Sequence, residues 1–293
     1  MLHSADLTKH YGSTLALDRL SLDVPAGAVF GLLGPNGSGK STFLKLVMGF
    51  IFPDAGRIER GGLCAGQIGY LSEHAFYPPR FGARDYLRTL GRLSGLRGRE
   101  LDGEAERLLE QLGMAHAAGK RLGAMSRGML QRIGLAQALL GNPPLILLDE
   151  PAAGLDPHAQ KFMRDQILAL QAAGKTIFLA SHHLDDVTRI CTHVAVLKQG
   201  RLLRTGTLAE LLGYGVRVTI LTGPLPDGLA ARLSAASPGV VVGDGQVSLD
   251  DQARAHKAEI LRLLLDAGVD IRRLDEQQAT LEEIYLQVTG DAT

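Results

Sequence analysis

The sequence predicts an α/β protein whose core carries a helical insertion and whose carboxyl-terminal part is a small α+β domain. Short apolar runs suited to strands alternate with helical patterns, residues 84–140 are almost wholly helical in pattern, and the composition changes near residues 213–215. A chain of 293 residues has room for one large domain and an appendage. We therefore expect domains over residues 1–212 and 215–293.

The first elements are predicted from alternating and apolar runs. Residues 15–18 and 20–24 alternate apolar and polar side chains, which indicates two strands joined by a turn. Residues 28–33 form an apolar run that ends in a glycine-rich loop, and residues 41–50 have the pattern and composition of a helix. The expected order at this point is strand, loop, helix.

The remaining core elements follow from the same signals. Residues 145–148 are uniformly apolar, as in a strand buried on both faces, and residues 177–180 and 194–197 are similar runs. Between about residues 84 and 140, leucines recur at helical spacing, which predicts a helical insertion in the α/β core.

Beyond residue 215 the pattern predicts a second, smaller set of strands and helices. Apolar runs and helical patterns are both short there, which is typical of an α+β domain. The expected strands are 216–221, 240–242, 247–249 and 269–274, and the expected helices are 229–234, 253–266 and 281–288.

Composition limits the classes of partner and the location. The 31 basic residues balance the 31 acidic ones, so no general field attracts nucleic acid, and no nucleic-acid partner is expected. No run of about 18 uncharged apolar residues occurs, and the first residues lack the pattern of a secretory signal, so a cytosolic location is expected. Cys64 and Cys191 lack metal-ligand spacing and are interpreted as reduced thiols.

A glycine-rich segment lies between the predicted strand and the predicted helix. Glycines at this spacing let successive N–H groups point inward toward phosphates, while Lys40 places a cation on the β- and γ-phosphates and Ser41 offers Mg²⁺ a hydroxyl. This loop alone serves kinases, GTPases and many ATPases. The segment consists of Gly34, Pro35, Asn36, Gly37, Ser38, Gly39, Lys40, Ser41 and Thr42.

Two further motifs carry phosphate chemistry. Asp149 ends a buried strand, where a carboxylate is costly unless it coordinates something, and Mg²⁺ through water is its natural partner. Glu150 points to the other side and can act as general base on the attacking water. Ser126 and Gly128 begin a predicted helix over residues 129–140, whose positive end binds phosphate; the alternative is an ordinary serine-capped helix.

Taken in order, four motifs resemble the nucleotide-binding subunit of an ATP-binding cassette (ABC) transporter, over about residues 1–212. They are residues 34–42, the segment 125–132, residues 145–150 and the triplet Gly154, Leu155 and Asp156. The resemblance implies a P-loop ABC-type ATPase core with an antiparallel β subdomain and a helical subdomain, and ATP and Mg²⁺ as cofactors.

The resemblance also implies a role for residues that spacing alone does not identify. Tyr11 would stack on adenine, Glu73 would replace a glutamine that contacts Mg²⁺ and water, and His182 would touch the γ-phosphate. The implied catalytic residues are Lys40, Glu150 and His182. The implied nucleotide-binding residues are Tyr11, residues 34–42, Glu73, Ser126, Gly128, Asp149 and Asp156, and the implied metal ligands are Ser41, Glu73 and Asp149.

Three residues depart from the family pattern. Arg127 replaces the usual first glycine after the serine, Met129 replaces the usual glutamine, and Glu73 replaces the usual glutamine near Mg²⁺. A cation at a helix start is mildly unfavourable to the helix, by about 0.3–1 kcal/mol, but it attracts phosphates. A carboxylate at position 73 is expected to strengthen cation binding.

The resemblance implies partners as well. In the family, Ser126 and Gly128 meet the ATP of a second subunit, which gives two sites shared across a head-to-tail dimer and implies a homodimer. A separate membrane-spanning permease supplies the route, with residues 74–81 as the expected docking segment and the inner face of the cell membrane as the location. The tail, residues 281–290, is similar to that of subunits serving exporters of drugs, lipids, polysaccharides or similar substrates.

Other classes of function remain as alternatives. Segments 69–73 and 134–140 also resemble the subunit of a copper-processing transporter. A soluble ABC ATPase acting on ribosomes is the chief rival, although such chains usually carry two cassettes and a basic linker. The span between Thr42 and Met125 is too short for the coiled coil of a DNA-repair ATPase. Intact Lys40, Asp149 and Glu150 disfavour a regulator without catalysis.

Overall fold

The computed structural model describes residues 1–213, 217–277 and 280–290. The chain divides into two compact units, Met1–Gly206 and Thr207–Thr293. The predicted boundary at residues 213–215 therefore differs from the division in the structure, because α7 (Leu208–Gly213) belongs to the second unit. Residues 214–216 lie outside the described part of the chain.

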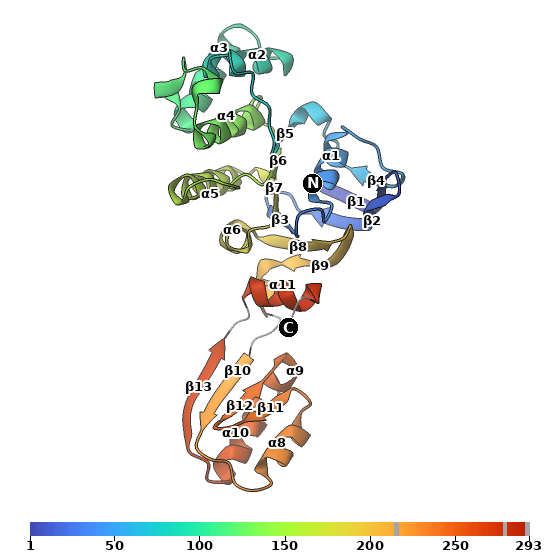
Figure 1. Ribbon diagram of the computed structural model, residues 1–293, viewed down its shortest axis with the longest axis vertical. Coiled ribbons are helices and arrows are strands. Elements are labelled where there is room, and N and C mark those ends of the chain that lie inside the picture. Colours follow the sequence, from blue (N-terminus) through green and yellow to red (C-terminus); the bar gives the residue numbers. More distant parts are fainter. Residues whose placement is uncertain (214–216, 278–279, 291–293) are drawn as a thin grey trace. The chain divides into compact units, whose positions relative to one another are not determined.

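The core of the first unit is a six-stranded sheet of strand order β5-β6-β7-β3-β8-β9 (Figure 1). The pairs β5 with β6, β6 with β7, β7 with β3, and β3 with β8 are parallel, so the carboxyl ends of these strands lie along one edge. The strands are β3 (Val29–Leu33), β5 (Ile68–Leu71), β6 (Leu145–Asp149), β7 (Thr176–Ser181), β8 (His193–Lys198) and β9 (Arg201–Thr207). Four of these strands, β3, β6, β7 and β8, confirm predicted apolar runs.

Helices cover both faces of this sheet. Figure 1 shows α1 (Lys40–Met48) on one side, and α5 (Pro157–Ala172) and α6 (Leu184–Ile190) on the other. Opposite faces are expected. The chain leaves β3 through α1 and returns to the sheet at β5, whereas the crossovers from β6 to β7 and from β7 to β8 run in the other direction along the sheet, and such crossovers are right-handed. The buried phenylalanines Phe43 of α1 and Phe178 of β7 pack with their ring centroids 5.3 Å apart.

A three-stranded antiparallel sheet packs beside this core. Its order is β2-β1-β4, with β1 (Leu2–Tyr11), β2 (Thr14–Val24) and β4 (Ala55–Glu59). The prediction of two strands over residues 15–18 and 20–24 was wrong, because both belong to β2. The polar pair Asp18 and Arg19 forms a β-bulge rather than a turn, and the actual turn follows Tyr11, where Gly12 has a φ of 58°.

The predicted helical insertion is confirmed. It contains α2 (Ala83–Leu93), α3 (Gly98–Gln111) and α4 (Arg127–Leu139), with 3₁₀ turns at Ala115–Ala117 and Leu122–Ala124. A further 3₁₀ turn, Ala65–Gln67, precedes β5. The helices bury most of the leucines that gave the helical pattern, including Leu87, Leu101 and Leu108, whereas Leu93 is 80% exposed.

The second unit is an antiparallel sheet with helices and a core of its own. Its strand order is β11-β12-β10-β13, and Val218, Ile220 and Val247 are among its fully buried residues. The predicted helix over residues 253–266 is interrupted near His256, which gives two helices. The elements are β10 (Arg217–Thr222), α8 (Leu229–Ala236), β11 (Val240–Gly243), β12 (Gln246–Leu249), α9 (Asp251–Arg254), α10 (Lys257–Asp266), β13 (Ile271–Gln277) and α11 (Leu281–Thr289).

Candidate nucleotide site

The glycine-rich loop joins β3 to α1 at the carboxyl edge of the parallel sheet. Gly39, the residue before α1, has a φ of 109°, and a Cβ there would lie 2.6 Å from the carbonyl oxygen of Ala16. Glycine is therefore required by conformation and by space. The Lys40 Nζ donates to the carbonyl oxygens of Gly34 at 2.7 Å and Pro35 at 3.3 Å, so the cation lies against the loop.

An open groove of about 870 Å³, open solvent included, runs along this loop. It brings together the predicted residues Tyr11, Glu73 and Glu150 with most of the loop, and the ring of Tyr11 is half exposed at its rim. The residues that line the groove are Tyr11, Thr14, Leu15, Ala16, Asn36, Gly37, Ser38, Gly39, Lys40, Ser41, Thr42, Glu73, His74 and Glu150.

Asp149 ends β6 beside the loop and is almost fully buried. Burial raises the pKa of its carboxyl group above the usual range, and a hydrogen bond from Ser41 acts against this shift. The negative charges of Glu150 and Glu73 also raise that pKa, whereas the cation of Lys40 lowers it. Asp149 Oδ1 has no hydrogen-bond partner among the described residues, so a buried oxygen ligand remains unsatisfied.

These oxygens fit Mg²⁺ by their chemistry. The hydroxyl of Ser41 and the carboxylates of Asp149 and Glu73 are hard ligands, and Mg²⁺ is usually held by one or two protein groups together with substrate phosphates. Within the described ranges, no group of three or more His, Cys, Asp or Glu residues would hold a metal ion by itself.

Glu150 lies between two other predicted catalytic residues. Its Oε1 is 2.9 Å from His182 Nδ1 and 3.4 Å from Lys40 Nζ, without hydrogen-bond geometry to any described group, and Ser181 Oγ donates to its Oε2 at 3.5 Å. Glu150 is 4% exposed and has a φ of 49°, in the left-handed region, which costs of order 1–3 kcal/mol for a residue other than glycine. The fold therefore holds this carboxylate in a strained conformation beside two cationic or polar partners.

The remaining predicted residues lie at two helix starts outside the lining of this groove. Ser126 caps α4, accepting a hydrogen bond from the Met129 N–H at 3.3 Å, and Asp156 caps α5, accepting one from the Ala159 N–H at 2.8 Å. Neither residue, nor Gly128, lines the groove formed by residues 34–42 of the same chain.

Sequence reasoning missed part of the groove wall. Thr14, Leu15 and Ala16 line it because they begin β2, which runs past the loop. Close approach of Ala16 to Gly39 carries no signal in the sequence, since the two residues lie on different elements. Ser181 was also missed, although it ends β7 directly before His182.

Fold and groove together define a P-loop nucleotide-binding protein, and comparison with known proteins identifies the family. Residues 17–153 match the sequence model described as ABC transporter. Nod factor export ATP-binding protein I of Rhizobium meliloti is 33% identical over 296 residues, which cover 98% of this chain and 87% of that protein. Daunorubicin resistance ATP-binding protein DrrA3 of Streptomyces coeruleorubidus is 33% identical over 297 residues, 97% of this chain and 94% of that protein.

Solved structures agree. The ATP-binding subunit of an ABC transporter superposes with a TM-score of 0.65 at 29% identity, covering 72% of this chain and 91% of that one. cbiO1 from Clostridium perfringens, part of the ABC transporter complex cbiONQ, superposes with a TM-score of 0.63 at 28% identity. The match covers 72% of this chain and 89% of that one. The chain belongs to the ABC transporter family, as an ATP-binding subunit with ATPase activity. None of its described helices is long and apolar enough to cross a bilayer.

Proposed function

We propose that this chain is the ATPase subunit of an exporter, that it binds MgATP between two copies of itself, and that it drives transport through a separate membrane-spanning subunit at the inner face of the cell membrane. The observation that carries this proposal is the convergence of Lys40 and His182 on Glu150, a residue of the groove lining: both nitrogens lie within 3.4 Å of Glu150 Oε1. Export as the direction is supported by the Nod factor export relative, which aligns over 98% of this chain.

The predicted site residues in and beside the groove each have a part in this proposal. Tyr11 offers its exposed ring to the base, and Lys40 leaves the loop carbonyls for the phosphates. Glu150 takes the proton of the attacking water, and His182 orients that carboxylate from its other side. Ser41, Asp149 and Glu73 would hold Mg²⁺, which neutralises phosphate charge when bound.

The proposed dimer is supported by predicted nucleotide-binding residues that do not line the groove. The start of α4 combines the cap of Ser126 with Gly128, where backbone N–H groups and the helix dipole favour a phosphate. Since neither residue lines its own chain's groove, the phosphate bound there would belong to a second copy. A head-to-tail pair then contains two equivalent composite sites.

Residues 74–81 are the proposed docking segment for the membrane subunit. Within it, Tyr77 is an anchor: its ring packs edge-on against Tyr86 with centroids 6.0 Å apart, and its hydroxyl lies against Gly134. Phe76, by contrast, is 81% exposed. An exposed phenylalanine directly before this anchor is suited to an apolar pocket on a partner.

Replacing Glu150 with glutamine tests the proposal. Hydrolysis should fall by about 10²–10⁴-fold because the general base is lost, while the chain should double in mass in the presence of MgATP because the nucleotide stays bound. Activity and light-scattering mass measure the two effects. Glu59→Gln, at an exposed carboxylate on β4, is the matched control and should hydrolyse ATP normally. A Glu150→Gln chain that stays monomeric and turns over at the native rate would refute the proposal.

A further inference from the structure

Two β-bulges lie side by side in the antiparallel sheet, one on each of its paired strands β1 and β2. Asp18 and Arg19 of β2 together face Thr8, because Leu17 pairs with Lys9 and Leu20 pairs with Leu7. The φ of Arg19 is 47°, in the left-handed region, and its backbone N–H donates to Thr8 Oγ1 at 3.2 Å. The bulge on β2 is thus stabilised by a hydroxyl group of the opposite strand.

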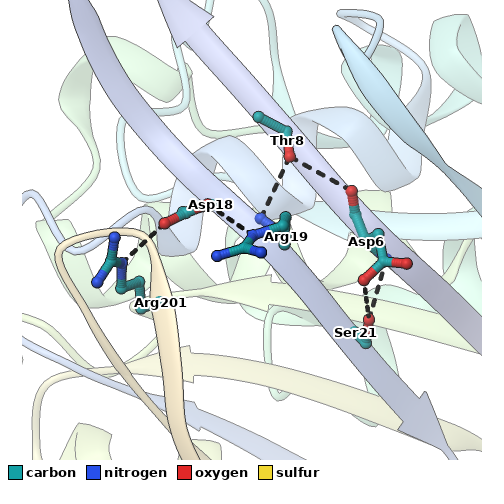
Figure 2. Close-up of polar contacts among 6 residues, drawn as sticks. All are labelled: Asp6, Thr8, Asp18, Arg19, Ser21 and Arg201. Atoms are coloured by element: carbon teal, nitrogen blue, oxygen red, sulfur yellow. Dashed lines mark hydrogen bonds and ion pairs between the residues drawn. The ribbon is translucent and has the colours of Figure 1, made fainter.

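The second bulge has the same construction. Asp6 of β1 also has a φ of 47°, and its backbone N–H donates to Ser21 Oγ at 2.9 Å (Figure 2). Thr8 Oγ1 in turn donates to the carbonyl oxygen of Asp6 at 3.3 Å, which links the two bulges. Both irregularities are therefore built and hydrogen-bonded, and they fix where the Asp18 side chain leaves the strand.

The strand β2 touches the phosphate loop through its backbone. A Cβ on Gly39 would lie 2.6 Å from the Ala16 carbonyl oxygen, and a Cβ on Gly200, in the turn between β8 and β9, would lie 2.7 Å from the same atom. The Asp18 N–H donates to the Gly200 carbonyl at 2.9 Å, and the Gly200 N–H donates to the Ser38 carbonyl at 2.9 Å. The β8–β9 turn thus bridges β2 and the phosphate loop.

A side-chain contact between Arg201 and Asp18 also connects the β8–β9 turn to β2. Arg201 Nε, at the start of β9, donates to Asp18 Oδ2 at 2.7 Å, and Figure 2 shows this contact to a residue of the bulge. Arg19 Nε reaches Oδ1 of the same carboxylate at 3.4 Å, but Arg19 belongs to the same strand and connects no second element. The Asp18 side chain is only 13% exposed, whereas that of Arg201 is 67% exposed.

We propose that the ion pair between Asp18 and Arg201 is a positioning contact for ATP, an inference that rests on the proposed nucleotide groove. The pair fixes the base-binding wall relative to the phosphate loop, where the base-binding wall consists of Tyr11 and residues 14–16. The two parts of the groove belong to different sheets, and ATP must contact both at once. Relative movement of the two parts therefore lowers the affinity for a ligand that spans the groove, but it does not lower the affinity for a ligand that occupies the loop alone.

The test compares two ligands of the full-length chain by isothermal titration calorimetry. ATP spans both walls, while inorganic tripolyphosphate has no base and needs only the loop. Arg201→Ala and Asp18→Asn should each weaken ATP binding by about three- to tenfold and change tripolyphosphate binding by less than about twofold. Arg201→Lys, which keeps the cation, should restore most of the ATP affinity. Tyr11→Ala should show the same selective loss, and combining it with Arg201→Ala should add little.

Arg19→Ala is the matched control, because it removes a cation from the same carboxylate without breaking a link between elements. ATP affinity of that variant should stay close to native. Equal weakening of ATP and tripolyphosphate in Arg201→Ala would overturn the positioning role in favour of general support of the loop, and unchanged ATP affinity would overturn it outright. If the native chain bound ATP no more tightly than its Lys40→Ala variant, the proposed nucleotide site itself would fall.

Discussion

At the scale of single residues, the site concentrates carboxylates where burial makes them costly. Asp149 and Glu150 are adjacent, almost fully buried and each left with an oxygen that lacks a hydrogen bond among the described residues. Such an arrangement lowers the stability of the chain without nucleotide and favours binding of cations and donors that satisfy those oxygens. In the proposed function, ligand binding would satisfy these oxygens and offset that loss of stability.

Asp149→Asn should raise the melting temperature of the nucleotide-free chain at neutral pH. The pKa of this carboxyl group is raised above its ordinary value of 3.8, so its ionisation destabilises the folded state, and the loss of stability grows as the pH rises from 3.8 through the raised pKa. The gain from Asp149→Asn should therefore be largest above the raised pKa and vanish toward pH 3.8. Melting curves across that range provide the measurement.

Asp165→Asn serves as the control, because Asp165 is an exposed partner of Lys161 on α5. Its melting temperature should change little with pH by comparison. A melting temperature for Asp149→Asn at or below native at every pH would contradict the assignment of burial as the main cause of the shift.

Gly39→Ala should lower the free energy of unfolding more than Gly174→Ala does. Both glycines have positive φ, 109° and 83°, but a Cβ at Gly174 would meet nothing within 4 Å, whereas one at Gly39 would meet the Ala16 carbonyl oxygen at 2.6 Å. Backbone strain alone costs of order 1–3 kcal/mol, so the difference between the two variants isolates the clash. Chemical denaturation measures it, and equal losses would show that the loop and β2 separate easily.

At the scale of elements, the sequence predicts a strand when its burial leaves a local pattern, and fails when the strand is defined by its pairing with another strand. Strands β3, β6, β7 and β8 were predicted because burial on both faces makes them uniformly apolar. The bulge in β2 was mistaken for a turn because a polar pair interrupts the alternation in both cases, and only the pairing with β1 distinguishes them. The mostly exposed strand β4 has no apolar pattern and was not predicted.

One substitution at the start of α4 should affect phosphate binding without affecting stability. Ser126→Asp keeps a good N-cap, so stability should stay within about 0.5 kcal/mol of native. The new carboxylate would nevertheless repel a phosphate at that helix end, so we expect a loss of the dimer that forms in MgATP when tested in the Glu150→Gln background. Dimers that form normally in this double variant would argue against a phosphate at the start of α4.

At the scale of the whole molecule, the motifs were predictable but their assembly was not. Spacing in the sequence identified Lys40, Asp149 and Glu150, because each is tied to a local pattern of strand, loop or helix. The approach of Thr14, Leu15 and Ala16 to the loop depends on contacts between two sheets, which no local pattern encodes. The sequence predicts a boundary at residues 213–215, whereas in the structure α7 already belongs to the second unit.

The most direct measurement of the central claim, that two chains share each ATP site, mixes two inactive variants. In a dimer of Lys40→Ala with Ser126→Asp, one composite site combines both defects and the other has neither. Each mixed dimer holds one intact site, so ATP hydrolysis should recover to about a quarter of the native rate if copies pair at random, and to at most about half if only mixed dimers form. A mixture no more active than its separate components, although mixed dimers are detected by mass, would contradict the account.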